Sequence, residues 1–443
     1  MITNETRPRG MRARCGWLLL AALGALGGLA PGCTPEETAT TSTGGTGTGG
    51  SDTGGNGTGA SDTGGSPAGG NGTGGNGTGG VGTGGNGTGG VGTGGNGTGG
   101  SGGGWAPVDS ARVFLSGHSL TDDPLADFVL EIAASRGKDF NYNQQIGLGS
   151  PIRVRTKGGS FDDPGWPGYS TGKNRDGSNM NVIEELKSPA TLGPGELYDT
   201  LLITERHDIL DTIPWEDTFG FLRHYHDRLI DGNAAGQTLF YHSWLDIDKN
   251  DPTLWIQHEK NALHAWECVA SKVNLSLAAE GRTDRAWTLP AGAALVDLVE
   301  RVLADEVPGI TGSTPQKLNA LFNDNVHLTP LGVYYIALVT YAAVFHDSPV
   351  GAAVPNGVAS QPAPALQQIA WDFVSAYHAS PSPGEHTMEE CRSFISQNLC
   401  SSFWTILDTP QKIGPCQTNY ANPDWSQNPF RWPDPQLSLW PDP

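Results

Sequence analysis

Two kinds of hydrophobic spacing alternate along residues 105–350 of the chain. Short apolar runs that end in turn-forming residues predict buried strands, whereas apolar residues spaced three and four apart predict amphipathic helices. The predicted strands cover residues 113–117, 143–146, 198–205, 237–244 and 286–290, and the predicted helices cover residues 125–134, 218–230, 255–279, 291–305 and 332–345. Strands that alternate with helices favour an α/β fold, in which a parallel sheet carries helices on its faces.

The segments on either side of this region have different compositions. Residues 41–104 are almost entirely Gly, Thr, Ser and Asn, so we expect residues 33–104 to form a disordered, flexible linker. Residues 351–443 begin with a stretch rich in Pro, Ala and Gly and contain one predicted helix at residues 366–377. No clear periodicity follows residue 380, which predicts a loop-rich extension that disulfides stabilise.

The first 32 residues have the layout of an export signal. Arginines at positions 7, 9, 12 and 14 precede an apolar run at residues 17–30, which is short for a membrane span and suits a signal peptide. The run ends in Leu29-Ala30-Pro31-Gly32-Cys33, which resembles a bacterial lipoprotein signal with its leucine one position early. This interpretation predicts cleavage before Cys33 and a lipid anchor on that residue. The alternative is ordinary cleavage, and both predict export to the cell envelope or cell surface.

The charge of the chain excludes some classes of partner. The formal net charge is −20, and residues 1–104 contribute almost none of it because four arginines there oppose five acidic residues. An acidic domain without a basic stripe argues against nucleic acid and against anionic membrane surfaces as partners.

The cysteines also favour an exported protein. Beyond the signal peptide and Cys33, the chain has Cys268, Cys391, Cys400 and Cys416, which permit two disulfides in three connectivities. No pair of cysteines, or of a cysteine and a histidine, has the spacing of a zinc site. We therefore expect no metal and no cofactor, and we expect the scattered histidines to lie on surfaces or helices.

A serine after the first predicted strand is the first candidate for chemistry. Residues 113–121 read Val-Phe-Leu-Ser-Gly-His-Ser-Leu-Thr, which places Ser119 in a turn at the C-terminal edge of the sheet, where α/β proteins form their sites. A serine becomes nucleophilic when a histidine accepts its proton and a carboxylate fixes the tautomer of that histidine. Asp324 and His327 offer such a pair directly before a predicted helix. The backbone N–H groups of Ser119 and Gly149 are candidates to bind a developing oxyanion. The alternative is a strand-end serine with a structural role only.

These segments resemble the conserved blocks of the SGNH/GDSL hydrolase family over roughly residues 111–346. Ser116-Gly117-His118-Ser119-Leu120 is similar to its Gly-Asp-Ser-Leu block, with His118 in place of Asp. Residues 147–151 resemble the block whose glycine donates to the oxyanion, and residues 323–332 resemble its final Asp-x-x-His block. The resemblance implies a flavodoxin-like three-layer α/β/α fold and the hydrolysis of esters, often acetyl groups on carbohydrates.

The third block of that family departs from the pattern. In place of Gly-x-Asn-Asp the chain has Thr204-Glu205-Arg206-His207-Asp208, which lacks the oxyanion-binding Asn. We therefore expect Glu205 and Arg206 near the oxyanion or substrate, and His118 either as a supporting hydrogen-bonding residue or as a structural histidine. The resulting prediction is an exported serine esterase that acts on an acylated small molecule or carbohydrate. A non-catalytic carbohydrate-binding protein and an acyltransferase are the alternatives.

Overall fold

The structure of the protein is a computed structural model that describes residues 105–157, 172–173, 175–380 and 384–435. The predicted signal peptide, the predicted linker and Cys33 lie outside these residues.

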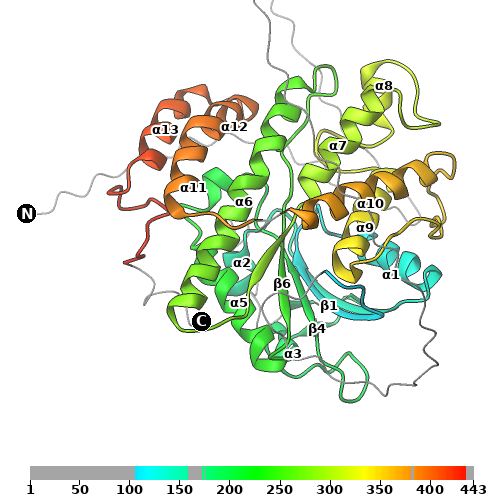
Figure 1. The fold of residues 1–443 in the computed structure, drawn as a ribbon, viewed down its shortest axis with the longest axis horizontal. Coiled ribbons are helices and arrows are strands. Elements are labelled where there is room, and N and C mark those ends of the chain that lie inside the picture. The colour runs from blue at the N-terminus through cyan, green and yellow to red at the C-terminus, as the bar shows by residue number, and fades with distance from the viewer. Residues whose placement is uncertain (1–104, 158–171, 174, 381–383, 436–443) are drawn as a thin grey trace, which may run out of the picture. The chain divides into compact units, whose positions relative to one another are not determined.

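In the described part of the chain, five strands form one sheet in which every neighbouring pair is parallel (Figure 1). They are β1 (Ser110–Gly117), β2 (Asp139–Ile146), β5 (Thr200–Ile203), β6 (Gln237–Tyr241) and β7 (Ala286–Leu289), in the order β2-β1-β5-β6-β7. The chain runs outward from β1 to β2 and then returns past β1 to β5. The direction of winding therefore changes at β1, and α/β sheets bind ligands beyond the strand ends at such a point.

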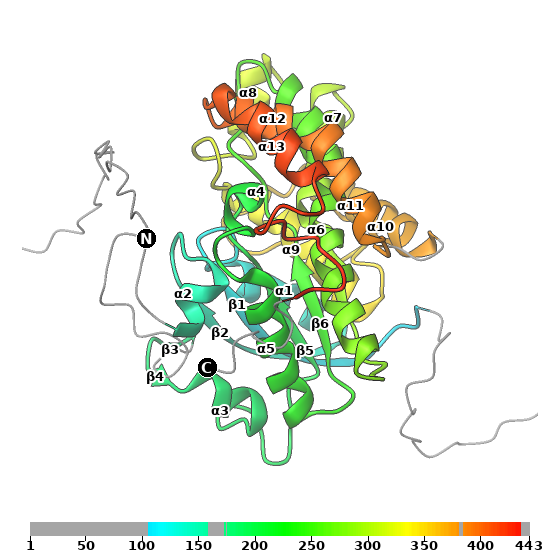
Figure 2. The same ribbon diagram turned by 90° about the vertical axis from the view of Figure 1, so that its left-hand side faces the viewer.

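Helices cover both faces of this sheet (Figure 2). One face packs against α1 (Leu125–Ser135), α7 (Ala291–Leu303) and α9 (Pro330–Phe345), with α8 (Thr314–Asn319) and α10 (Ala363–Ala379) beside them. The other face packs against α2 (Ile152–Lys157), α3 (Val182–Lys187), α4 (Ile209–Thr212), α5 (Thr218–Gly232) and α6 (Thr253–Ala279). Side chains of one strand alternate between the two layers, with Val113 and Leu115 in the first core and Phe114 in the second. The predicted three-layer α/β/α fold with a parallel sheet is confirmed.

A small antiparallel pair, β3 (Gly172–Lys173) with β4 (Asn179–Met180), forms a separate two-stranded sheet beside β2.

The C-terminal region contains more helix than the sequence predicts. The helix expected at residues 366–377 is confirmed as α10, but the expectation of a loop-rich extension is wrong. Three more helices follow, namely α11 (Met388–Phe394), α12 (Cys400–Ile406) and α13 (Ile413–Ala421), with a π-helical turn at Ile395–Leu399 and a 3-10 turn at Pro410–Lys412. Thr387 and Glu390 form a capping box that starts α11. A series of buried positions that follows is spaced three and four apart: Met388, Cys391, Ile395, Leu399 and Phe403. A second buried cysteine, Cys400, lies beside this series and a π-helical turn interrupts the helix, which obscures the pattern in the sequence.

Two disulfides hold these C-terminal helices. Cys268 of α6 pairs with Cys391 of α11, and Cys400 pairs with Cys416, which selects one of the three connectivities that the sequence leaves open. The helices α11 and α12 accordingly lie against α6, as Figure 1 shows. Two disulfides fit an exported protein. Among the residues that the structure describes, no helix has the combination of length and apolar character needed to cross a membrane.

Candidate active site

Ser119 lies in a tight turn directly after β1. The turn is closed by Thr121, whose backbone N–H and side-chain hydroxyl both donate to the carbonyl of His118, at 2.8 and 3.0 Å. Gly117 is required here because a Cβ at this position would stand 1.8 Å from the Thr121 Oγ1. Strand, glycine and turn together present the partly buried Ser119 side chain at the C-terminal edge of the sheet, as the sequence predicts.

His327 and Asp324 form a chain of hydrogen bonds with Ser119. His327 Nε2 lies 3.1 Å from Ser119 Oγ, and His327 Nδ1 lies 2.7 Å from Asp324 Oδ2. A carboxylate only accepts hydrogen bonds, so Nδ1 carries the proton and Nε2 is free to accept the serine O–H. The three residues that the sequence singles out are therefore within reach of one another, in the geometry that proton transfer from Ser119 requires.

The carboxylate of Asp324 is fixed by its own loop. Its Oδ1 accepts the backbone N–H groups of Val326 and His327, at 2.8 and 2.6 Å. Partial burial alone would raise the pKa of Asp324, but the hydrogen bonds from the side chain and backbone of His327 and from Val326 outweigh it and lower that pKa. Asp324 is therefore ionised at neutral pH.

The loop that carries Asp324 and His327 is attached at both ends. Trp244, after β6, donates its indole N–H to the carbonyl of Val326 at 2.9 Å, and the Ile247 N–H donates to the carbonyl of Asn325 at 2.8 Å. On the other side, Thr329 caps α9 by accepting the N–H of Gly332. The position of His327 thus depends on β6 and α9 together.

Two backbone N–H groups at the same sheet edge have no hydrogen-bond acceptor in the part of the chain that the structure describes. Gly149 follows β2 with φ = +64°, a conformation that favours glycine. The turn is tied to β1 because the Gly147 N–H donates to the Gly117 carbonyl at 2.9 Å. Within the described residues, neither the Ser119 N–H nor the Gly149 N–H donates a hydrogen bond. The role of the two N–H groups in binding an oxyanion stays a prediction.

Glu205 occupies a different place from the one expected. Its side chain is 0% exposed, and its carboxylate accepts the N–H groups of Ile152 and Arg206 and the hydroxyl of Thr218, at 3.1, 2.8 and 2.7 Å. The expectation that Glu205 contacts the substrate is therefore wrong: the carboxylate points inward and joins the turn after β5 to α2 and α5.

Arg206 and His118 do not line the cleft at Ser119 either. The guanidinium of Arg206 pairs with Asp208. His118 is 1% exposed, and its Nε2 lies 3.0 Å from the carbonyl of Glu205. A carbonyl only accepts, so Nε2 carries the proton, and Nδ1 accepts the Leu120 N–H at 3.4 Å. His118 therefore supports the turn around Ser119.

The pattern of the sequence does not reveal Arg155, which lies behind the site. It is 0% exposed and donates to Ser116 Oγ at 3.0 Å, to the Ser150 carbonyl at 2.7 Å and to the Thr204 carbonyl. Ser116 lies near the end of β1, Ser150 lies in the turn after β2, and Thr204 directly follows β5, so one guanidinium connects the C-terminal ends of three strands. Arg155 lies in a six-residue helix, which is too short to show a periodic pattern.

A cleft of about 350 Å³ opens beside Ser119 and His327. Its wall is mostly apolar, with two carboxylates and no lysine or arginine among the described residues that line it: Ser119, Leu120, Asp122, Asp123, Pro124, Leu125, Trp244, Asn323, His327, Leu328, Pro330, Val333 and Ile336. Such a wall repels anionic ligands and suits an uncharged one.

Comparisons with known proteins add little to this picture. No family model matches the chain, and no curated protein matches it. Among solved structures, the chain is similar to a DUF4886 family protein from Bacteroides uniformis, with 13% identity and a TM-score of 0.41 over 62% of this chain and 98% of that one. The fold assignment rests on the parallel sheet itself.

Proposed function

We propose that this protein is a serine ester hydrolase and that its substrate is an O-acylated carbohydrate or a related small ester. The observation that supports the proposal is the placement of His327, 3.1 Å from Ser119 and 2.7 Å from Asp324. The order of the three residues along the chain and the parallel sheet agree with the resemblance to SGNH/GDSL hydrolases. That resemblance is also the basis for a carbohydrate substrate.

In the proposed reaction His327 removes the proton of Ser119 while the serine oxygen attacks the acyl carbonyl carbon. The N–H groups of Ser119 and Gly149 donate to the oxygen of the tetrahedral intermediate. The bond to the alcohol then breaks, and His327 Nε2 returns the proton to the leaving oxygen. Water next attacks the carbonyl carbon of the acyl-serine while His327 accepts a proton from the water. The bond to Ser119 Oγ then breaks, His327 returns this proton to the serine oxygen, and the carboxylic acid leaves. Asp324 stabilises the imidazolium that forms in each half of the reaction.

The cleft is consistent with an uncharged acyl ester. Leu125, Val333 and Ile336 provide an apolar surface for an acyl chain or a sugar face, whereas Asp122 and Asp123 favour hydroxyl groups over anions. Neutral acetylated sugars meet both conditions.

The test is hydrolysis of p-nitrophenyl acetate by the full chain, combined with labelling by a fluorophosphonate probe. Ser119→Ala should lower kcat by about 10³-fold or more and abolish labelling, and Asp324→Asn should lower kcat by about 10²-fold or more. Ser401→Ala is the matched control, because Ser401 is an exposed serine on α12, and this variant should keep the kcat of the wild type and its labelling by the probe.

Equal rates for the wild type and Ser119→Ala would refute the proposal. Absence of labelling together with retained affinity for a glycan would indicate a binding protein instead. Transfer of the acyl group to a sugar rather than to water, seen in the products, would indicate an acyltransferase.

We further propose that the protein is exported and is anchored through a lipid on Cys33. The N-terminal signal motivates the anchor, and the two disulfides fit the export. Cys33→Ser should move the protein from the membrane fraction of the producing cell to the soluble exported fraction. An unchanged distribution would show that Cys33 does not anchor the protein.

A further inference from the structure

A second cluster of functional side chains lies where α6 meets the segment before α11. His264 and Glu267 lie three residues apart on α6, which places them on the same face of the helix. His386 lies just before α11. One ligand atom from each of the three side chains lies within 4.8 Å of the others. None of the three lines the cleft at Ser119.

The donor atoms of the cluster are held in place but are not all satisfied. His386 Nε2 lies 2.8 Å from Glu267 Oε2, and the other carboxylate oxygen accepts the hydroxyl of Tyr377 at 2.8 Å. His264 stacks on Phe394, with 3.9 Å between ring centroids. Its Nε2 is buried and has no hydrogen-bond partner among the described residues. A buried ring nitrogen without a partner is costly unless it finds another ligand.

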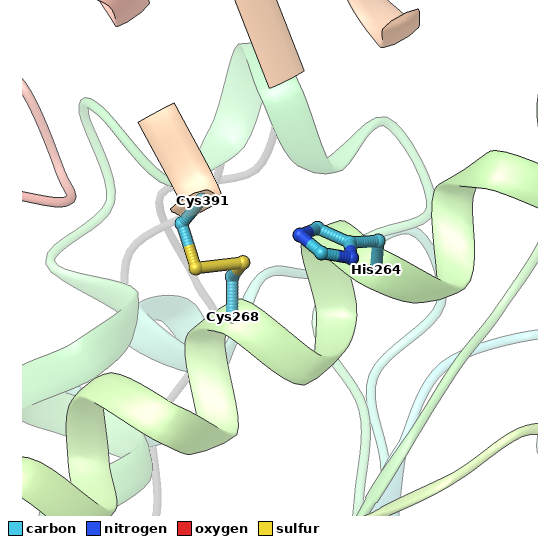
Figure 3. A group of neighbouring side chains, drawn as sticks. All are labelled: His264, Cys268 and Cys391. Atoms are coloured by element: carbon cyan, nitrogen blue, oxygen red, sulfur yellow. A yellow bond between two sulfur atoms is a disulfide. The ribbon is translucent and has the colours of Figure 1, made fainter. Parts of the chain in front are cut away.

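A disulfide fixes the two elements that carry these donors. Figure 3 shows His264 on α6 close to Cys268, whose bond to Cys391 lies beside the imidazole. Cys268 comes about one turn after His264, and Cys391 follows His386 after a similar interval. The sulfurs are bonded to each other, so they are not metal ligands here. The disulfide instead keeps His386 opposite His264 and Glu267.

The cluster also has access to solvent. It borders an open hollow of about 570 Å³ whose rim includes both histidines and the acidic residues Glu389 and Glu390. A small cation can enter there, and a water molecule has room as a fourth ligand.

We propose that His264, Glu267 and His386 form a binding site for a divalent transition-metal ion, with Zn²⁺ as the best match. Two imidazoles and a carboxylate with one open position are a donor set that zinc prefers, and calcium prefers oxygen alone. Tetrahedral zinc at about 2.0–2.1 Å from each donor holds the donors about 3.4 Å apart, so closure needs a movement of roughly 1 Å. Two metal–ligand bonds then replace the hydrogen bond between His386 and Glu267. The ion would connect α6 to the C-terminal helices, in addition to the disulfide.

The inference is independent of the esterase proposal, and its test needs no enzyme activity. Zinc is titrated by calorimetry into the metal-free full chain with its disulfides intact, and thermal unfolding is recorded with and without zinc. The wild type should bind one zinc per chain at micromolar Kd or tighter, show a higher Tm with zinc, and bind calcium at least a hundredfold more weakly.

Variants locate the site. We expect zinc binding to weaken at least tenfold in each of three variants, His264→Ala, His386→Ala and Glu267→Gln. Glu267→Gln keeps an oxygen that accepts the Tyr377 hydroxyl, so a loss of binding in this variant is not explained by loss of that hydrogen bond. His378→Ala is the matched control, since that partly buried histidine of α10 stacks on Trp105 outside the cluster, and it should keep the affinity of the wild type. Zinc binding of equal strength in all variants, or no zinc binding by the wild type, would overturn the proposal.

Discussion

Three polar side chains are buried directly behind Ser119, namely His118, Arg155 and Glu205. Burying such groups is unfavourable unless hydrogen bonds replace the lost water, and each of the three has such bonds to backbone or side-chain atoms. Their partners lie at the C-terminal ends of β1, β2 and β5 and at the starts of α2 and α5, so these side chains connect the segments that carry Ser119 and Gly149. Glu205, which belongs to the third block of the sequence, thus stabilises the site from the interior of the protein.

His118 makes folding depend on pH. Burial, followed by repulsion from Arg155, lowers the pKa of His118 to about 3. The unfolded chain binds a proton on this histidine below its ordinary pKa of about 6.5, whereas the folded protein does not until the pH approaches 3. The contribution of neutral, buried His118 to stability is therefore fully present above about pH 6.5, and it decreases as the pH falls below that value. His118 alone should lower the free energy of unfolding by about 2 kcal/mol between pH 7 and pH 5.

Urea unfolding at pH 7 and pH 5 checks this prediction. In His118→Asn, whose side chain does not titrate, the difference between the two pH values should shrink by about that amount. If the variant and the wild type lost the same stability between pH 7 and pH 5, another group would be responsible.

The start of α9 packs closely against the segment that leads into the His327 loop. Gly332, in the first turn of this helix, has the Leu321 carbonyl so near that a Cβ would stand 2.4 Å from its oxygen. Leu321 belongs to the segment that enters the loop, and the Thr329 N–H donates to this same carbonyl at 2.9 Å. Helix and loop therefore pack backbone against backbone, and the loop cannot move without α9.

Gly332→Ala should push these two segments apart. The overpacking should cost about 1–3 kcal/mol in the free energy of unfolding, and displacement of His327 should lower kcat/KM for ester hydrolysis at least tenfold. Gly414→Ala is the control, because Gly414 also lies in the first turn of a helix but has nothing within 4 Å of the added Cβ. Equal effects of the two substitutions on unfolding would argue against the close approach at Gly332.

The two disulfides constrain the whole chain to different extents. Cys268–Cys391 spans 123 residues and ties the C-terminal helices to the α/β core, whereas Cys400–Cys416 spans 16 residues within those helices. In the chain-entropy view, a disulfide stabilises a protein by restricting the unfolded chain, and a longer loop loses more freedom.

Replacing each pair by alanine should separate the two contributions. We expect the Cys268→Ala/Cys391→Ala protein to lose about 4–5 kcal/mol of unfolding free energy and the Cys400→Ala/Cys416→Ala protein to lose about 3 kcal/mol. Urea unfolding without reductant measures both, each against the wild type. The reverse order would mean that native packing at the shorter bridge, rather than loop length, controls stability.

Local patterns in the sequence were sufficient to find the five strands, the long helices and the parallel sheet, although β2 begins at Asp139, four residues earlier than predicted. The reason is that the spacing of apolar residues reflects which face of each element is buried. They were also sufficient to single out Ser119, Asp324 and His327, since each belongs to a short motif beside a strand end or a helix start. The turn chemistry of Gly117 and Thr121 acts within a few residues and is visible in the same way.

Other features depend on segments that meet only in the folded chain. Packing sets the burial of Glu205, the three strand ends that Arg155 connects and the choice of disulfide partners. No local pattern encodes which distant groups packing brings together. The same holds for His264 and His386, which lie more than a hundred residues apart in the sequence. Whether a polar side chain faces solvent, substrate or a buried partner is decided by the surfaces that enclose it, and those surfaces exist only once the helices have packed on the sheet.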